Sequence, residues 1–269
     1  MRPPSAEPSA LSAGEGIVPA AINFAFRRVT RLGAGAALAS GRQLGLLRPA
    51  RAQNQYATHL PILIGLARMV PVRRVLELGC GNHSTFTFLD RRAFPDLITL
   101  ESLETDAAWA RHIAEENRRE PRLNLRLVED PLETVLRQLP LNAYDLLLVD
   151  HSDKYEIRAA TISFLANCAP GRTLVMLHDY EIPLYRRAAR GFRHRFEFTA
   201  FTPSTCLACG HSPVRRGALR SLERAIKRHA RTLRPDDAAA WIAVLDDEFG
   251  AARPASGQEP LCACSSSHP

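Results

Sequence analysis

The feature that most constrains the fold is an alternation of short apolar segments with longer mixed segments between residues 74 and 179. Each apolar segment has the length of a buried strand, and each segment between them is long enough for a helix. Parallel strands need such crossover connections, so the alternation predicts a parallel sheet with helices on both faces. The expected strands are 75–78, 97–103, 123–128, 144–151 and 173–177.

The segments on either side complete the predicted fold. An apolar helix over 56–70, with Pro61 in its first turn, precedes the first strand. Strands at 195–201 and 205–210 are expected to close the sheet as an antiparallel pair. The fold class is therefore α/β: a Rossmann-like, doubly wound, mostly parallel seven-stranded sheet with a terminal antiparallel strand pair. We expect three parts, with an N-terminal extension over 1–54, the main domain over 55–212, and a C-terminal helical extension with a loose tail over 213–269.

The N-terminal extension has two interpretations. Residues 1–16 are rich in Pro, Ser, Ala and Glu, which is typical of disorder. The stretch Phe-Arg-Arg-Val-Thr-Arg-Leu at 26–32, followed by small apolar residues, is either an accessory helix or a twin-arginine export signal. Arg42 and Arg48 interrupt the apolar region and favour the helix. No apolar run is long enough to span a bilayer, and six cysteines are too few for a disulfide scaffold, so we expect a cytoplasmic protein.

Basic residues are unevenly distributed along the chain. The formal charge is +7, yet residues 16–76 contain no acid and Glu223 is the only acid between Arg215 and Arg234. Such blocks bind nucleic acid or an anionic surface, or are simply solvated helix faces. The helix expected over 214–233 is amphipathic, and its apolar stripe docks on the core or on a second copy in a homodimer. That stripe consists of Leu219, Leu222, Ile226 and Leu233.

The candidate ligand site begins where the first strand ends. The sequence there reads Glu77-Leu-Gly79-Cys80-Gly81, and helix-starting residues follow at Asn82, Ser84 and Thr85. Glycines allow a sharp turn close to a ligand, and the N–H groups of a helix N-terminus favour nucleotide-like groups at the end of a strand. The dinucleotide fingerprint G-x-G-x-x-G is absent, because Ser84 stands at the place of its third glycine.

The run Glu77-Leu-Gly79-Cys80-Gly81, with its acid two residues before the first glycine, resembles motif I of the class I S-adenosylmethionine (SAM)-dependent methyltransferases. The resemblance covers about residues 55–212 and implies that SAM is the cofactor. Glu104, at the end of the second strand, would accept the ribose hydroxyls. An acid after the third strand would contact the adenine amine. Glu129 and Asp130 are adjacent candidates for this acid, and we favour Asp130. The implied SAM-binding set is Glu77, Gly79, Cys80, Gly81, Asn82, Ser84, Thr85, Glu104, Thr105, Asp130, Pro131 and Asp150.

Acidic and basic side chains follow the fourth and fifth strands. Methyl transfer to a hydroxyl needs a base or a cation that lowers the pKa of the acceptor. The expected catalytic group is Asp150, His151, Lys154, His178 and Asp179. The run is similar to the metal-dependent catechol-type O-methyltransferases, in which Asp150 and Asp179 would bind Mg²⁺ and Lys154 would be the base.

Two departures from that branch favour a metal-free site. Tyr180 stands where the branch has an asparagine ligand, and the stretch from Asp150 to Lys154 differs in length. We therefore predict no metal ligands and expect His151 or His178 to act as the base. A zinc site from Cys206, Cys209, His211, Cys262 and Cys264 is not favoured, because side chains at 206 and 209 of one strand point to opposite faces.

The sequence thus predicts a SAM-dependent methyltransferase that acts on an oxygen of a small molecule. Two alternatives stay open. One is a methyltransferase for RNA or protein, recruited by the basic flanks. The other is a binding module that keeps the fold without catalysis.

Overall fold

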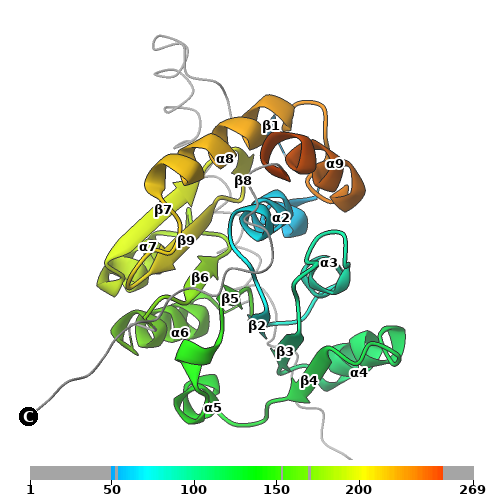
Figure 1. Ribbon diagram of the computed structural model, residues 1–269. Coiled ribbons are helices and arrows are strands. Elements are labelled where there is room, and N and C mark those ends of the chain that lie inside the picture. The colour runs from blue at the N-terminus through cyan, green and yellow to red at the C-terminus, as the bar shows by residue number, and fades with distance from the viewer. Residues whose placement is uncertain (1–49, 52–53, 153, 169–170, 251–269) are drawn as a thin grey trace, which may run out of the picture. The chain divides into compact units, whose positions relative to one another are not determined.

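The computed structural model describes residues 50–51, 54–152, 154–168 and 171–250. They belong to one compact unit, Pro49–Pro269, which Figure 1 shows. The predictions for residues 1–49, including the export-signal alternative, lie outside the described residues, as do Cys262 and Cys264. Within the described part of the chain, no helix combines the length and the apolarity that crossing a membrane requires.

The central sheet has seven strands in the order β4-β3-β2-β5-β6-β9-β7. Strands β2 to β6 are parallel, while β9 runs antiparallel to both of its neighbours. This arrangement confirms the predicted fold class. The strands are β2 (Arg74–Leu78), β3 (Thr99–Glu104), β4 (Leu123–Leu127), β5 (Leu146–Val149), β6 (Leu174–Leu177), β7 (His194–Phe198) and β9 (Thr205–Cys209).

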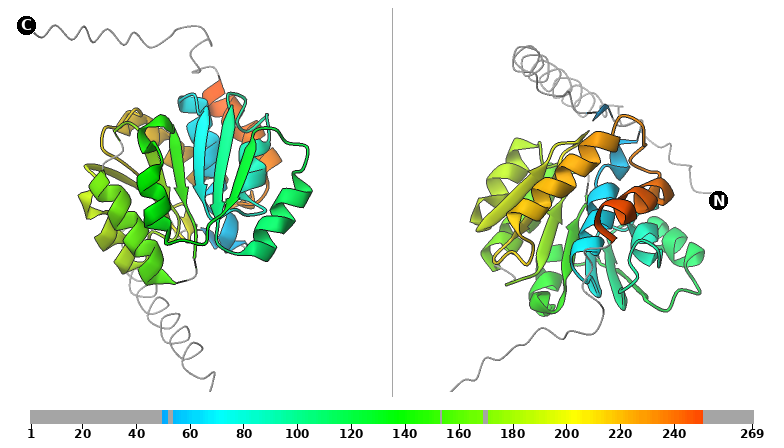
Figure 2. Two further views of the ribbon diagram at one scale, coloured as in Figure 1. Left: turned by 90° about the horizontal axis from the view of Figure 1, so that it is seen from below. Right: turned by 45° about the horizontal axis from the view of Figure 1, so that its top comes forward.

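Helices cover both faces of the sheet, as Figure 2 shows. One face carries α2 (Leu60–Met69), α3 (Ser84–Leu89), α8 (Arg216–His229) and α9 (Ala238–Phe249). The other face carries α5 (Leu132–Gln138), α6 (Tyr155–Cys168) and α7 (Pro183–Ala188). Helix α4 (Ala107–Glu116) packs beside β3 and β4. Short 3-10 turns lie at η1 (Gln55–Ala57), η2 (Leu141–Ala143) and η3 (Ala189–Gly191).

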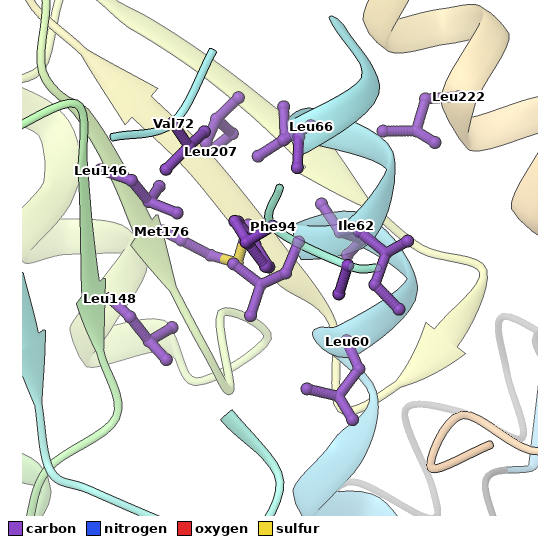
Figure 3. Packing of buried hydrophobic residues seen from close by; sticks show 14 of the residues in the cluster. Leu60, Ile62, Leu66, Val72, Phe94, Leu146, Leu148, Met176, Leu207 and Leu222 are labelled. Atoms are coloured by element: carbon purple, nitrogen blue, oxygen red, sulfur yellow. The ribbon is translucent and has the colours of Figure 1, made fainter. Parts of the chain in front are cut away.

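The core of the first face is built around α2. Figure 3 shows Leu60, Ile62 and Leu66 of this helix near side chains from β5, β6 and β9. Leu222 of α8 lies on the far side of α2 and belongs to the same cluster. The apolar stripe predicted for the C-terminal helix is thus docked on the core. Because β5 and β6 are covered on both faces, all four residues of each strand are buried, as continuous apolar runs require.

Some element boundaries differ from the sequence prediction. The helix expected from residue 56 begins at Leu60, because residues 55–57 form the 3-10 turn η1. The strand expected over 195–201 ends at Phe198, and β8 (Phe201–Thr202) pairs instead with β1 (Ala50–Arg51) in a separate two-stranded sheet. On β9, Cys206 faces one core cluster and Cys209 the other, as expected for a strand.

Candidate active site at the switch point of the sheet

The candidate site lies where the strand order reverses. From β2 the chain moves outward to β3 and β4, then returns to β5 on the other side of β2. In doubly wound sheets the crevice beyond the carboxyl ends of such strands is the usual ligand site. Here the Gly79 amide donates to Leu103 O at 2.9 Å, and the Asp150 amide donates to Leu78 O at 3.0 Å. The residues that follow β2, β3 and β5 therefore meet at one edge.

Gly79 makes the turn after β2 and cannot be replaced without strain. Its φ is +88°, a conformation that residues with a Cβ rarely adopt. A Cβ at this position would lie 2.8 Å from both Asp150 O and His151 Cα, which are backbone atoms. The glycine thus allows the loop after β2 to approach the loop after β5.

A buried acid fixes the loop from behind. Thr85 Oγ1 accepts from the Gly81 amide at 3.0 Å and donates to Glu77 Oε2 at 2.8 Å. Ser102 on β3 donates to the same oxygen at 2.6 Å. Burial raises the pKa of Glu77 to about 7, although the hydrogen bonds from Ser102, Ser84 and Thr85 oppose the rise. Glu77 therefore acts on the loop through Thr85, and its side chain is fully buried.

Glu104 joins the glycine loop to the start of α4. Its Oε2 accepts from the Cys80 amide at 3.1 Å, and its Oε1 accepts from the amides of Thr105 and Asp106 at 2.7 and 2.9 Å. The Cys80 thiol lies 3.5 Å from Oε2. A carboxylate oxygen accepts about two hydrogen bonds. Each oxygen therefore has two donors, and the one that a ligand hydroxyl could replace is the Cys80 thiol on Oε2, because S–H is a weak donor.

The remaining residues predicted to hold SAM surround this loop. Trp109 of α4 donates from its indole nitrogen to Cys80 O at 2.7 Å and fixes the loop on that side. Ser84 and Thr85 are buried in the first turn of α3. Asn82, Thr105, Asp130 and Pro131 are exposed. The segment before Asp130 runs beside Glu104, because the Val128 amide donates to Glu104 O at 2.7 Å.

A network of charged groups joins the ends of β5 and β6. One guanidinium nitrogen, Nη1 of Arg158, lies 3.1 Å from Asp150 Oδ1 and 3.0 Å from Asp179 Oδ2. Arg158 also donates to the carbonyls of His151 and Ser152, at 2.6 and 2.9 Å. Asp179 has a φ of +56°, in the left-handed region that Asp tolerates better than most residues. Arg158 on α6 thus forms an ion pair with each strand-end carboxylate, so one positive charge is shared between two negative charges.

His178 connects this network to the segment before α2. Its Nδ1 lies 3.2 Å from Asp150 Oδ1, and its Nε2 lies 3.0 Å from Thr58 Oγ1. Burial lowers the pKa of His178, but the Asp150 carboxylate outweighs burial and raises it to about 9. Burial alone would raise the pKa of Asp150, but His178 and Arg158 hold it well below its usual range. The pair is therefore charged at neutral pH.

Two further histidines are buried and neutral at the same place. His59 packs edge-on against His178, with the ring centroids 4.8 Å apart. Its burial and the charge of His178 lower its pKa to about 3. His151 follows Asp150, and burial together with Arg158 lowers its pKa to about 4. The His151 Nε2 is buried and has no hydrogen-bond partner among the described residues.

The structure brings Asp150, His178 and Asp179 together, with His151 next in the chain. Lys154 is exposed just before the first turn of α6. Arg158 and Thr58 are not among the site residues predicted from the sequence. For His59 the sequence allows contact with substrate but favours an ordinary packing or surface position. The one available signal was spacing, since Arg158 follows Lys154 by one helical turn on a helix that begins at the strand end.

No protein-family model matches the chain, and no match was found among curated protein sequences. Solved structures with a similar fold include spermidine synthase from Thermotoga maritima, with 14% identity, a TM-score of 0.45, and coverage of 73% of this chain and 74% of that chain. Human methyltransferase-like protein 13 in complex with SAH is 18% identical over 66% of this chain and 94% of its own, with a TM-score of 0.44.

An O-methyltransferase from Bacillus cereus in complex with SAH is 13% identical over 65% of this chain and 89% of its own, with a TM-score of 0.41. At such identities and scores, these matches say nothing about what this chain binds or transfers. The strand order and the antiparallel β9 themselves confirm the fold that the resemblance to class I SAM-dependent methyltransferases implies.

Proposed function

We propose that this chain is a SAM-dependent methyltransferase that transfers the methyl group to an oxygen of a small molecule. The observation that carries the proposal is the contact between the glycine loop and Glu104, with Cys80 N 3.1 Å from Glu104 Oε2 at the switch point of the sheet. A carboxylate and a close backbone turn at one edge suit a nucleoside. We further propose that the protein acts in the cytoplasm, where SAM is a metabolite.

The donor end of the site fits a nucleoside on two grounds. The close approach at Gly79, which a Cβ would block, keeps the loop next to the backbone of Asp150 and His151. At Glu104 Oε2 a ribose hydroxyl could replace the weak Cys80 thiol hydrogen bond, and exposed Asp130 is available for the adenine amine. When bound, SAM supplies an electrophilic methyl group.

Of the two histidines predicted as the base, His151 has a ring nitrogen without a hydrogen-bond partner among the described residues. His178 is charged and bonded at both ring nitrogens, so it has no lone pair for an acceptor hydroxyl. His151 is neutral, and its Nε2 is buried without a partner among the described residues. We therefore assign the base to His151 in preference to His178 and Lys154, and give Asp150 and Arg158 the role of holding the His151 backbone.

Arg158 also supports a site that works without Mg²⁺. In the catechol-type arrangement a magnesium ion would bind between the carboxylates at the two strand ends. Here the Arg158 guanidinium contacts both carboxylates, at 3.1 and 3.0 Å. Mg²⁺ could take that position only by displacing the guanidinium from between the two carboxylates.

The basic face of α8 gives less support to an RNA substrate. Lys227 pairs with Glu223 at 2.8 Å, and Arg228 pairs with Glu248 on α9. These pairs neutralise part of the positive charge that the sequence alone suggests. We therefore keep a small molecule as the proposed acceptor.

The test is transfer of a labelled methyl group from SAM to a panel of phenols, alcohols and carboxylates. We expect label on oxygen, and a fall of roughly 10²- to 10⁴-fold in kcat for His151→Ala, as for the loss of a general base. The matched control is His112→Ala, an exposed histidine on α4. Saturable SAM binding without transfer to any acceptor would instead identify a binding module. Full activity in His151→Ala would refute the assigned base.

A further inference from the structure

Three side chains from different parts of the chain converge beside the proposed acceptor site. His59 precedes α2, Asp150 follows β5, and His178 follows β6. Each offers one ligand atom, and these atoms all lie within 4.8 Å of one another. His59 and His178 are almost fully buried, at 1% and 2% exposure.

His59 is the residue whose environment needs explaining. Both of its ring nitrogens are buried, and neither has a hydrogen-bond partner among the described residues. Leaving a polar group buried without a partner costs about 1–3 kcal/mol, so buried polar groups are nearly always satisfied. A ligand that accepts a nitrogen lone pair would satisfy one of these atoms.

The surroundings of His178 and Asp150 suit the same ligand. Thr58 Oγ1 lies 3.0 Å from His178 Nε2, so Nε2 can keep its proton while a metal ion replaces the proton on Nδ1, which faces Asp150. Metal-bound histidines are typically held in this way by an outer hydrogen bond. The 3.2 Å between Nδ1 and Asp150 Oδ1 is close to the roughly 3.3 Å between two ligands on a tetrahedral ion with bonds of about 2.0 Å, whereas ligand atoms as far apart as 4.8 Å in this set would move together when an ion binds.

We propose that His59, Asp150 and His178 form a binding site for a divalent transition-metal ion of the zinc type. Two imidazoles and one carboxylate are a common ligand set for Zn²⁺ and Fe²⁺, whereas Mg²⁺ prefers oxygen ligands. The site differs from the magnesium arrangement in both ligands and ion. It joins the segment before α2 to the ends of β5 and β6.

Arg158 is compatible with this ion, although it contacts Asp150. Arg158 Nη1 and His178 Nδ1 both contact Asp150 Oδ1, so on metal binding the guanidinium would share that oxygen with the ion or move to Oδ2 of the same carboxylate. Arg158 also keeps its second carboxylate, Asp179, at 3.0 Å. Metal binding would release the proton from His178, and the two carboxylates and one guanidinium would then leave a net negative charge that favours a divalent cation.

The test measures metal binding on the full chain without donor or acceptor, so it does not depend on the proposed function. The metal-free protein is titrated with Zn²⁺ and with Co²⁺, whose visible absorption reports tetrahedral coordination. We expect one ion per chain and an affinity loss above about 100-fold in His59→Ala. This loss is larger than the one expected when a residue that only hydrogen-bonds to a metal ligand is replaced. The control His112→Ala should bind as wild type does. Thr58→Val, which keeps the side-chain shape, should lose about 10- to 100-fold.

X-ray absorption on the zinc-loaded wild type needs no variant and separates this site from the cysteines. We expect only nitrogen and oxygen neighbours at about 2.0–2.1 Å. Zn–S scattering at about 2.3 Å would overturn the proposal, because it would place the ion on cysteines. Unchanged affinity in His59→Ala, or binding of Mg²⁺ but not Zn²⁺, would also overturn it.

Discussion

Replacing Gly79 with alanine should damage the fold and the site together, whereas Gly81→Ala should spare the fold. A residue with a Cβ held at a φ of +88° costs about 1–3 kcal/mol. The added Cβ would also lie 2.8 Å from two backbone atoms of the β5 loop, which cannot rotate away as a side chain would. Alanine also lowers the conformational entropy of the unfolded chain, which offsets this loss of stability by about 0.4–1 kcal/mol. We expect a net loss of about 2–4 kcal/mol in the free energy of unfolding for Gly79→Ala.

Gly81 provides the matched control in the same loop. A Cβ there would lie 3.6 Å from Ser84 Oγ, an ordinary contact, and no positive φ is involved. Gly81→Ala should therefore change stability by less than about 1 kcal/mol. Urea unfolding followed by circular dichroism measures both variants. If Gly79→Ala is as stable as wild type, the close approach of the two loops is not as described.

Three further outcomes follow from the buried charges. Glu77 has a pKa raised from 4.5 to about 7, so the folded state binds the extra proton, and stability should fall by about 3 kcal/mol as pH rises from 4.5 to 7. Glu77→Gln should abolish that fall in urea unfolding at a series of pH values, and an unchanged slope would contradict the assignment. His178 has a pKa raised from 6.5 to about 9, so its contribution to the free energy of unfolding is complete below pH 6.5 and is lost as pH rises to 9. Asp150→Asn should remove this pH dependence, and NMR titration of the His178 imidazole should show a lower pKa in that variant. Arg158→Met should cost about 3 kcal/mol, because it leaves His178 as the one cation in contact with two half-buried carboxylates among the described residues. A variant as stable as wild type would show that the Arg158 ion pairs contribute nothing.

The sheet was predictable because buried parallel strands leave a strong local signal. The apolar runs that become β5 and β6 are covered on both faces, so every residue in them is apolar. The acid at Glu104 was identified by its place at the end of β3, which the fold determines. Its contact with Cys80 then follows from the parallel register of β2 and β3.

The parts that the sequence did not predict depend on contacts between distant segments. Arg158 reaches Asp179 only because α6 packs across β5 and β6, and nothing local distinguishes it from an arginine on a helix surface. His59 becomes buried because the turn before α2 lies against the end of β6, where it meets His178. The short strand β8 forms only because β1 pairs with it.

The most direct test of the central claim is a calorimetric titration of SAM into wild type, Glu104→Gln and the control Glu101→Gln. Glu101 is on the same strand but pairs with Arg126 and Tyr144 away from the glycine loop. We predict one-site binding to wild type and Glu101→Gln. A hydrogen bond to a charged acceptor contributes about 1.5–3 kcal/mol, so Glu104→Gln should raise Kd roughly 10- to 150-fold. Equal Kd values for Glu104→Gln and wild type, or no binding of SAM to folded wild type, would contradict the proposed site.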